Sequence, residues 1–358
     1  MKILIVGDWH SLLHEEAVFQ AFKTLGHESH RFSWHEYFKS AYSKRTFVSG
    51  LDLFFKKFQN KFILGRLLNK INDDLLRKVR AVKPNIIFIY RGTHIKPVIL
   101  ARIKSDHPDI ILVGYNNDDP FSKGHPFWLW RFFLQSIPIY DVIFAYRKNN
   151  IVDFMKTGAK KVFLLRSWYI PGLNHPVNLN AEDQVRYKTD VVFAGHYEPD
   201  GRLEMLEEIV ICGFELKIFG SGKYWNPILK KSPVLKSLIP VKLVWAEEYN
   251  KALCGAKIAL CFLSKINRDN YTRRNFEIPS TRTLMLSEFS EDLAGLFKEG
   301  QEAEYFRNKS ELISKIRLYI SDNELRAQVA QAGFEKVVRN KHDVVSRMEE
   351  VLRLLKTL

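Results

Sequence analysis

The sequence predicts an α/β protein made of two doubly wound domains, each with a parallel sheet covered by helices on both faces. Three observations lead to this prediction. The chain has 358 residues, which is more than one hydrophobic core usually fills. Short apolar runs alternate with helical stretches, as they do in parallel sheets. A stretch rich in proline, glycine and asparagine at residues 171–176 separates two such series.

The first series predicts an N-terminal domain over residues 1–170. Its expected strands are residues 2–6, 29–34, 86–90, 110–115, 141–145 and 162–165. Its expected short helices are residues 15–25, 97–104 and 149–156. Apolar residues recur at three- and four-residue spacing between residues 42 and 82, so we expect a long basic helical region there, closed by Pro84.

The second series predicts a C-terminal domain over residues 189–335, after a linker at residues 171–188. Its expected strands are residues 190–194, 215–219, 258–262 and 283–286. Its expected helices include residues 202–212, 247–254 and 275–281. We expect residues 336–358 to form a helix that packs back across the domains.

The positive charge lies almost entirely in the first half of the chain. The net charge is +15. Residues 1–170 hold 27 Lys and Arg against 14 Asp and Glu, a difference of +13, and the remainder holds 28 against 26, or +2. Such a field favours an anionic partner, such as a phosphorylated or lipid-linked acceptor or a membrane surface, although a basic solvated face fits equally well. We expect no nucleic-acid partner, because no recognised binding motif accompanies the charge.

Two aromatic stretches lie in this basic half. Residues 41–83 interleave lysines and arginines with Phe47, Leu51, Leu53, Phe54, Phe55, Phe58 and Phe62. Residues 127–133 read FWLWRFF, the aromatic content of an interfacial segment. Core packing and peripheral association with an anionic membrane both remain open for them.

The cysteines and the hydropathy indicate the compartment. Cys212, Cys254 and Cys261 lack the spacing of a metal site and cannot all pair, so a reducing cytoplasm fits best. No apolar run reaches the roughly 20 residues that span a bilayer, and no leader segment is expected before the strand at residues 2–6. We therefore expect a cytoplasmic protein, with the inner face of the membrane as the alternative location.

Glycines, arginines and a glutamate follow the strands of the second domain. In open parallel sheets, ligands bind at the carboxyl ends of the strands. Glycines there let backbone amides approach a pyrophosphate, and arginines donate to phosphate oxygens. A carboxylate one turn later can accept hydrogen bonds from a ribose. A nucleotide-diphosphate site is therefore predicted, although Gly-Ser-Gly also suits a simple turn and Arg-Arg a solvated pair. The candidates are Gly195, His196, Gly220, Ser221, Gly222, Arg273, Arg274 and Glu277.

The segment from Arg274 to Leu284 reads RNFEIPSTRTL and resembles the donor-site signature of GT-B glycosyltransferases, especially the spore-maturation-protein CgeB-like group. Similar stretches occur at residues 116–121, 140–144, 203–206, 296–302, 330–333 and 341–343. The resemblance covers nearly the whole chain and is most specific between residues 190 and 345. It implies the GT-B fold, with two facing Rossmann-like domains and an interdomain cleft.

The resemblance also implies an activity, the transfer of a sugar from a nucleotide-diphosphate donor to a glycan, lipid-linked or other anionic acceptor. Carried over residue by residue, it assigns Glu277 to the donor ribose, Arg273 or Arg274 to the diphosphate, and Gly195 and Gly220 to the donor cleft. Since GT-B enzymes generally stabilise the diphosphate with basic residues and helix dipoles, no metal and no cofactor beyond the donor are expected.

One position departs from the pattern of the group. Arg282 stands where the group usually has glycine, and a long cation there can contact a phosphate or the acceptor, or point to solvent. Arg282 and the neighbouring Thr283 therefore join the donor-site candidates.

The first domain is expected to supply the acceptor site and the general base. Asp8, Arg91 and His94 follow predicted strands and are the acceptor-binding candidates. A base must reach the acceptor hydroxyl, and His10, Asp119 and Asp118 are the candidates. A turn or helix cap at Asp118-Asp119-Pro120 and a satisfied loop histidine at His10 are the structural alternatives.

Two other functions remain open on this fold, because a fold does not fix an activity. One is a non-catalytic nucleotide-sugar-binding or scaffold protein. The other is a different nucleotide-sugar enzyme, such as an epimerase or a hydrolase.

Overall fold

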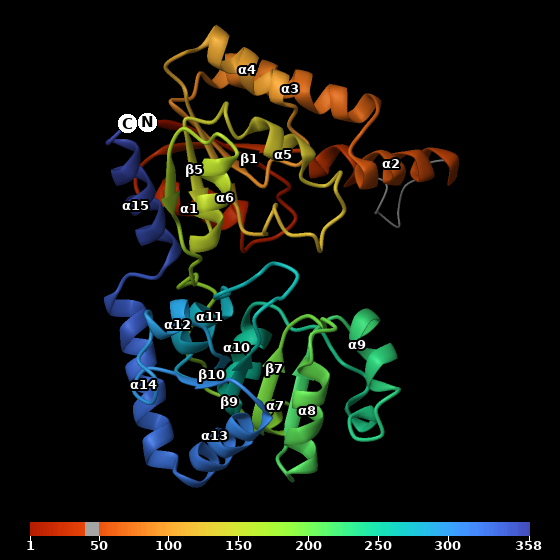
Figure 1. Cartoon of the computed structure of the whole chain (residues 1–358), viewed down its shortest axis with the longest axis vertical. Coiled ribbons are helices and arrows are strands. Elements are labelled where there is room, and N and C mark those ends of the chain that lie inside the picture. Colours follow the sequence, from red (N-terminus) through yellow and green to blue (C-terminus); the bar gives the residue numbers. More distant parts are fainter. Residues whose placement is uncertain (40–49) are drawn as a thin grey trace. The chain divides into compact units, whose positions relative to one another are not determined.

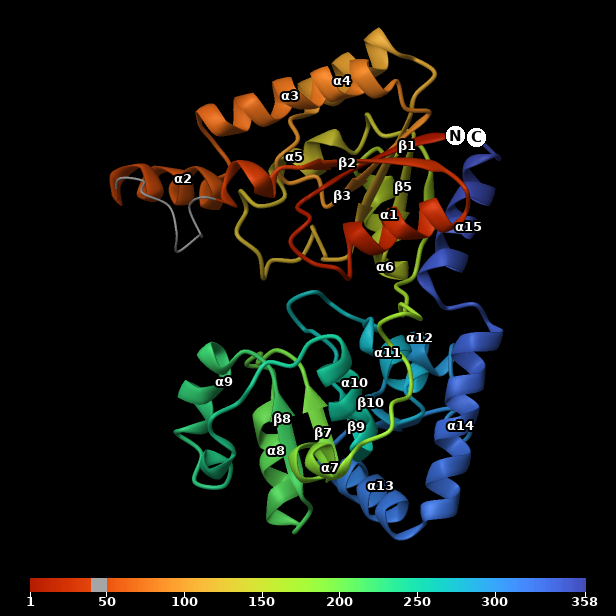
Figure 2. The ribbon, with the colours of Figure 1, turned by 180° about the vertical axis from the view of Figure 1, so that it is seen from behind.

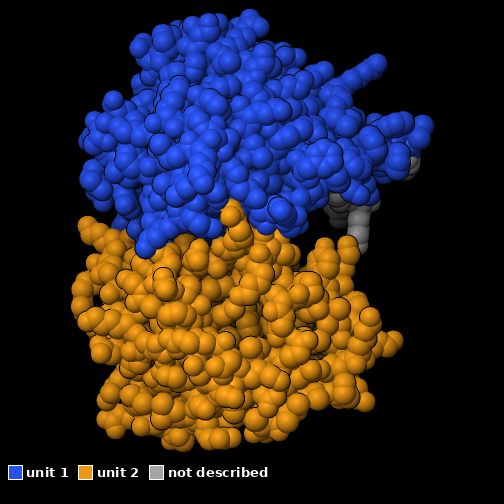
Figure 3. Space-filling view, in the orientation of Figure 1, with its two compact units in different colours: residues 1–166, 344–358 blue, residues 167–343 orange. Residues whose placement is uncertain are grey.

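The computed structural model describes residues 1–39 and 50–358, and these fall into two compact units. Unit 1 comprises residues 1–166 and 344–358, and unit 2 comprises residues 167–343 (Figures 1 and 3). Each unit contains one parallel sheet with helices, so the predicted α/β class with two doubly wound sheets is confirmed.

Unit 1 is built on a six-stranded parallel sheet with the order β2-β1-β3-β4-β5-β6. Its strands are β1 (Lys2–Gly7), β2 (Glu28–Ser33), β3 (Ile86–Tyr90), β4 (Ile111–Asn116), β5 (Val142–Ala145) and β6 (Val162–Leu164). Its helices are α1 (Glu15–Thr24), the short 3₁₀ helix η1 (His35–Tyr37), α2 (Gly50–Phe62), α3 (Arg66–Val82), α4 (Pro97–Asp106), α5 (Arg131–Ser136), α6 (Lys148–Lys156) and α15 (Val344–Leu355).

The central strands of unit 1, β1, β3, β4 and β5, are largely apolar and buried because helices cover both faces of the sheet. On one face, Leu4 and Ile87 belong to a core cluster that includes Leu75 of α3 and Leu100 of α4. On the other face, Phe88 packs edge-on against Phe22 of α1, with ring centroids 6.2 Å apart. Continuous apolar strand sequences are typical of sheets buried in this way.

The helical region predicted over residues 42–82 is divided in the structure. Helix α2 ends at Phe62 and α3 begins at Arg66, with Gly65 at φ +89° between them. Ile63, directly after α2, has φ +55°, and Gly65, directly before α3, adopts its left-handed conformation at little cost, so the chain turns between two helices that the apolar spacing alone would join. The first part of the predicted region, which includes Phe47, lies outside the described residues.

Unit 2 is built on a five-stranded parallel sheet with the order β11-β10-β9-β7-β8. Its strands are β7 (Thr189–Ala194), β8 (Leu216–Phe219), β9 (Ala256–Cys261), β10 (Leu284–Glu288) and β11 (Glu304–Phe306). Its helices are α7 (Ala181–Tyr187), α8 (Arg202–Ile211), α9 (Gly222–Leu229), the 3₁₀ helix η3 (Lys236–Leu238), α10 (Glu247–Cys254), α11 (Arg274–Ser280), α12 (Glu291–Ala294), α13 (Lys309–Ser321) and α14 (Asn323–Arg339).

The segments expected at the domain boundaries differ in detail from the structure. Residues 171–188, expected as a linker, fall within unit 2, where Asn180 caps α7 through a hydrogen bond from the Asp183 amide. The helix expected over residues 336–358 is interrupted: α14 ends at Arg339 and α15 starts at Val344. Helix α15 packs against α1 and belongs to unit 1 (Figure 2).

Candidate functional site

In unit 2, the carboxyl ends of β7 and β8 lie side by side with very little room between their backbones. The Gly195 amide donates to the Phe219 carbonyl over 2.9 Å. A Cβ atom on Gly220 would lie 2.4 Å from the Gly195 carbonyl oxygen, so this position excludes every side chain. Two of the predicted glycines are thus packed tightly against each other where β7 and β8 end, and the Gly220 amide donates to the Lys242 carbonyl over 2.9 Å.

Helix α9 starts directly after this backbone. Ser221 precedes its first residue, Gly222, where a Cβ atom would lie 2.7 Å from the Val241 carbonyl oxygen. Trp225 donates its indole N–H to the Gly195 carbonyl over 2.9 Å and so ties the helix to the end of β7. Sequence reasoning missed Trp225, because no helix was predicted between residues 219 and 247; in the structure α9 forms there with Pro227 inside it.

Arg274 joins the start of α11 to the same edge. Its Nε donates to the Ala194 carbonyl over 2.7 Å, and its guanidinium comes so near Gly195 that a Cβ atom there would lie 3.1 Å from Nη2. The structure therefore brings Gly195, Gly220 and Arg274 together at the carboxyl ends of β7 and β8.

Arg273 and Glu277 form a second pair one turn apart on α11. The Arg273 Nε lies 2.6 Å from Glu277 Oε1, and the Tyr249 hydroxyl donates to Glu277 Oε2 over 3.1 Å. Glu277 is only 3% exposed, and these two donors satisfy its buried carboxyl oxygens and hold the side chain in place. Burial, and then the charge of Glu277, raise the pKa of Tyr249, which keeps its hydroxyl protonated as a donor. Each carboxylate oxygen retains acceptor capacity for a further hydrogen bond.

His196 follows Gly195 at the end of β7. Partial burial and then the positive charges of Arg274, Arg202 and Arg273 lower its pKa. Its ring is therefore neutral at physiological pH and can accept or donate a hydrogen bond without repelling the arginines.

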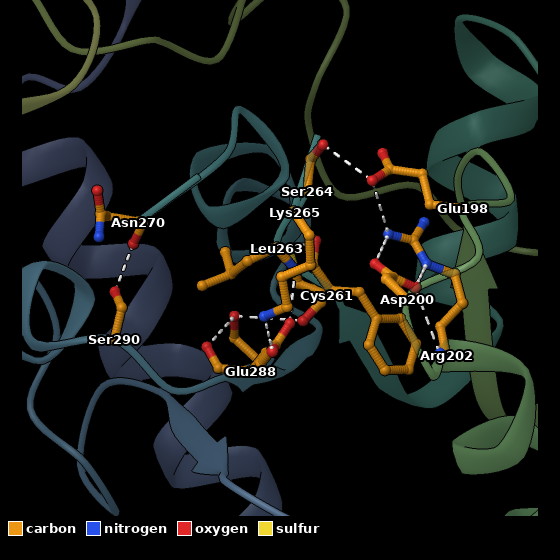
Figure 4. A network of polar contacts seen from close by, with 12 residues as sticks. Glu198, Asp200, Arg202, Cys261, Leu263, Ser264, Lys265, Asn270, Glu288 and Ser290 are labelled. Carbon is orange, nitrogen blue, oxygen red and sulfur yellow. Dashed lines mark hydrogen bonds and ion pairs between the residues drawn. The ribbon is translucent and has the colours of Figure 1, made fainter. Parts of the chain in front are cut away.

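A polar network, shown in Figure 4, holds the loops that follow β7, β9 and β10. Glu198 accepts from the Ser264 hydroxyl over 2.9 Å, and Arg202 pairs with Asp200 at 2.6 Å. Glu288 accepts from the Leu263 amide over 3.0 Å. Sequence reasoning missed this network, since the contacts of Glu198 with Ser264 and of Glu288 with Leu263 join residues far apart in the chain.

Arg282 and Thr283 lie at the amino ends of the unit 2 strands, opposite the carboxyl ends where Gly195 and Gly220 lie. Both precede β10, and the Thr283 hydroxyl donates to the Leu253 carbonyl over 3.1 Å. The Arg282 guanidinium lies over the Phe334 ring, 4.4 Å from its centroid. Both line a cavity of about 620 Å³ among the amino ends of the strands, away from Gly195 and Gly220. The structure thus separates these two candidates from the others.

In unit 1, Asp8 and His10 form a pair after β1. His10 Nδ1 lies 2.8 Å from Asp8 Oδ2, and His35, which the sequence did not single out, places its Nδ1 3.5 Å from Asp8 Oδ1. The hydrogen bond to Asp8 raises the pKa of His10 against the opposing effect of burial. For Asp8, burial alone would raise the pKa, but the hydrogen bond from His10 and the neighbouring charges bring it below its usual value. The His10 side chain is 47% exposed, so a substrate can reach it.

Arg91 and Asp118 pair across the neighbouring strands β3 and β4, with Nη2 and Oδ2 2.8 Å apart. Asp119 is fully buried instead. Its Oδ1 accepts from the Phe121 amide over 3.0 Å and from Asn150 Nδ2 over 2.9 Å. This geometry gives Asp119 the turn-forming role rather than access to a substrate, so the expectation of a catalytic base there does not fit.

His94 is 5% exposed and stacks on Trp34, with ring centroids 5.4 Å apart. Its Nε2 lies 3.1 Å from Asn60 Oδ1, and burial lowers its pKa to about 4. It lines a pocket of about 440 Å³, which we call the unit 1 pocket. The lining residues are Asp8, His10, Trp34, His35, Asn60, Lys61, Ile63, Arg91, Thr93, His94 and Leu129.

Comparison with known proteins identifies this architecture. Residues 202–353 match a family model described as glycosyl transferase-like. The sucrose-phosphate synthase of Thermosynechococcus elongatus superposes with a TM-score of 0.68 at 10% identity, covering 100% of this chain and 99% of the other. HepE of Anabaena, solved in complex with UDP-glucose, gives a TM-score of 0.66 at 13% identity over 100% of both chains. The fold is that of the GT-B glycosyltransferases.

A third GT-B structure is a putative UDP-N-acetylglucosamine 2-epimerase from Listeria monocytogenes, with a TM-score of 0.59 at 12% identity over 100% of this chain and 96% of the other. No curated protein sequence matches the chain closely enough to count as a relative. The resemblance to GT-B glycosyltransferases is thus confirmed, and the glycosyl transferase-like region includes Gly220, Arg273, Arg274 and Glu277.

Proposed function

We propose that the protein is a glycosyltransferase that moves a sugar from a nucleotide-diphosphate donor to a glycan, lipid-linked or other anionic acceptor, without a metal ion. The observation that carries the proposal is the cluster that Gly195, Gly220 and Arg274 form where β7 and β8 end. Parallel sheets bind ligands at the carboxyl ends of their strands, and an arginine there can donate to the oxygens of a diphosphate. The glycosyl transferase-like match over residues 202–353, which includes Gly220 and Arg274, supports the same assignment.

In the proposed reaction, unit 2 binds the donor. Glu277 accepts hydrogen bonds from the ribose hydroxyls, while Arg273 and Arg274 offset the charge that develops on the leaving diphosphate. Uridine diphosphate is the first nucleotide to test, because HepE was solved with UDP-glucose.

Unit 1 supplies the acceptor site in this proposal. The unit 1 pocket binds the acceptor through Arg91, and His10 removes the proton from the attacking hydroxyl in an inverting transfer. Asp8 holds the His10 ring with Nδ1 engaged, which directs Nε2 to the proton transfer. We further propose a cytoplasmic location, which the three free cysteines support.

A thermal-shift screen against UDP, GDP, CMP, dTDP and ADP tests donor binding. A nucleotide at about 100 times its Kd stabilises the fold by roughly 2.7 kcal/mol. We expect one nucleotide to raise the Tm of the wild type and to leave the Glu277→Gln variant unchanged. Glu182→Ala removes an exposed glutamate of α7 and is the matched control. No shift with any nucleotide would contradict the donor-site assignment.

Product analysis separates the competing functions. An epimerase, which the Listeria structure keeps as the second candidate, converts the donor without an acceptor. A hydrolase releases free sugar, and a scaffold protein binds the nucleotide sugar without turnover. A transferase gives a new product only when an acceptor is present.

A further inference from the structure

Helix α2 carries six large apolar side chains that the sheet does not cover. Among its residues 51–62, every one is at least partly exposed, and Leu51, Phe54, Phe55 and Phe58 are between 42% and 67% exposed. The next helix, α3, buries seven of its residues against the sheet. In both views of the ribbon, α2 extends away from the sheet of unit 1 (Figures 1 and 2). Within the part of unit 1 that the structure describes, these phenylalanines therefore join no core.

The rings of α2 continue into the loop before α5 as one connected surface. Ring centroids are 6.3 Å apart between Phe54 and Phe58, 4.7 Å between Phe58 and Phe62, and 5.3 Å between Phe62 and Trp128. Phe127, 86% exposed, extends the series at 5.3 Å from Trp128. We call this set, with Phe55, the aromatic ridge. Trp128 donates to the Lys61 carbonyl over 3.1 Å, so the loop is fixed to the helix.

Positive charge accompanies the aromatic ridge. Helix α2 carries three lysines and one aspartate, and that aspartate, Asp52, pairs with Lys56 at 2.9 Å. Lys57 and Lys61 are exposed, and Lys61 Nζ lies 5.3 Å from the Phe62 ring centroid. Rings and ammonium groups on one short helix match the boundary of a bilayer, where rings enter the acyl region and ammonium groups meet lipid phosphates.

We propose that the aromatic ridge docks the protein onto an anionic lipid membrane. The partner is a lipid surface because the exposed area combines large apolar rings with a net positive charge in the basic half of the chain. Since no helix of the described residues is long and apolar enough to cross a bilayer, the contact is peripheral.

The ridge adjoins the unit 1 pocket, which Asn60 and Lys61 of α2 and Leu129 of the loop help to line. Resting on the proposed function, this adjacency indicates an acceptor carried by a lipid in the same membrane. Vesicle binding and sugar transfer are separate measurements. Binding without transfer would defeat the proposed function alone, and transfer without binding would defeat the docking alone.

Flotation of the full chain with phosphatidylcholine vesicles, with and without phosphatidylglycerol, tests the docking. We expect the protein to float with the anionic vesicles, and the double variant Phe54→Ser/Phe58→Ser to bind them at least about tenfold more weakly. Lys57→Glu should weaken binding to anionic vesicles only. Val185→Ser removes an exposed apolar side chain from unit 2 and should float like the wild type.

Three results would overturn the proposal. The wild type would fail to float with anionic vesicles, or the double variant would float as well as the wild type. Alternatively, size-exclusion chromatography would show that the wild type is a dimer and the double variant a monomer. The surface that the aromatic ridge contacts would then be a second copy of the chain. Phe54 and Phe58 lie in unit 1, whereas the donor-site candidates lie in unit 2. An unchanged thermal shift with nucleotide therefore verifies that the double variant is folded.

Discussion

The Nδ1 atom of His10 lies 2.8 Å from Oδ2 of Asp8. This contact raises the pKa of His10 and lowers the pKa of Asp8. The ring is both oriented and made more basic by this contact. A carboxylate that fixes a partly exposed histidine is the arrangement that a general base requires.

Removing the imidazole should therefore slow the chemical step. We expect His10→Ala to lower kcat by about 10²- to 10⁴-fold. His30→Ala is the matched control, because His30 pairs with Glu28 at 2.9 Å on β2. In Asp8→Asn the pKa of His10 falls, so the acidic limb of kcat/KM should move to lower pH. An unchanged pH profile in this variant would show that His10 is not the base.

A side chain at position 220 should disrupt the sheet edge. The Cβ of Gly220→Ala would meet the Gly195 carbonyl oxygen at 2.4 Å, and the backbone must move to relieve the contact. We expect the free energy of unfolding to fall by about 1–3 kcal/mol. We also expect the variant to lose the rise in Tm that nucleotide causes in the wild type. Gly172→Ala has open space around its Cβ and should match the wild type in both measurements. Normal nucleotide binding by Gly220→Ala would rule out a tight backbone site.

Asp119 should matter for stability and not for catalysis. Asp119→Ala leaves the Phe121 amide and Asn150 without their shared acceptor, which costs about 1–3 kcal/mol. Denaturant unfolding measures this loss, and Asp109→Ala, at an exposed aspartate of the same unit, is the control. A fall in kcat of several orders of magnitude at unchanged stability would restore Asp119 as a base.

The buried imidazole of His94 should make stability depend on pH. Its pKa is lowered to about 4, so between pH 6.5 and 4 the unfolded chain binds a proton that the native protein excludes. Its contribution is present above pH 6.5 and is lost as pH falls. From about pH 7 to about pH 5, this amounts to roughly 2 kcal/mol. His94→Gln should lack this part of the pH dependence in urea unfolding, and an identical dependence in both proteins would refute it.

The sequence predicted most strands because their signal is local. The run Ile86–Tyr90 is buried at every position, as its uninterrupted apolar sequence indicated. The break at Gly65 was not predicted, since the apolar spacing continues on either side of it. Helix α9 was missed because Pro227 lies inside it, and β11, Glu304–Phe306, is too short to give a pattern.

The site was predictable where its residues follow strands directly. Gly195 and Gly220 come together because parallel strands end at one edge. The contact between Tyr249 and Glu277 joins residues 28 apart, and no periodicity marks it. Arg282 became a candidate because it replaces a glycine of the family's donor-site pattern, five residues after Glu277, but it lies among the amino ends of the strands, on the far side of α11 from Arg274. Residues that are close in sequence can therefore lie at opposite ends of the sheet when a helix separates them.

The return of α15 to unit 1 has a consequence for synthesis on the ribosome. Its buried residues Val344, Met348, Val351, Leu352 and Leu355 lie in a helix that packs on α1, and all of them are translated after the whole of unit 2. Unit 2 is contiguous and can fold as soon as Asp343 has emerged. Unit 1 begins first and is completed last, so α1 keeps an uncovered apolar face during elongation, a site where a nascent-chain chaperone would bind.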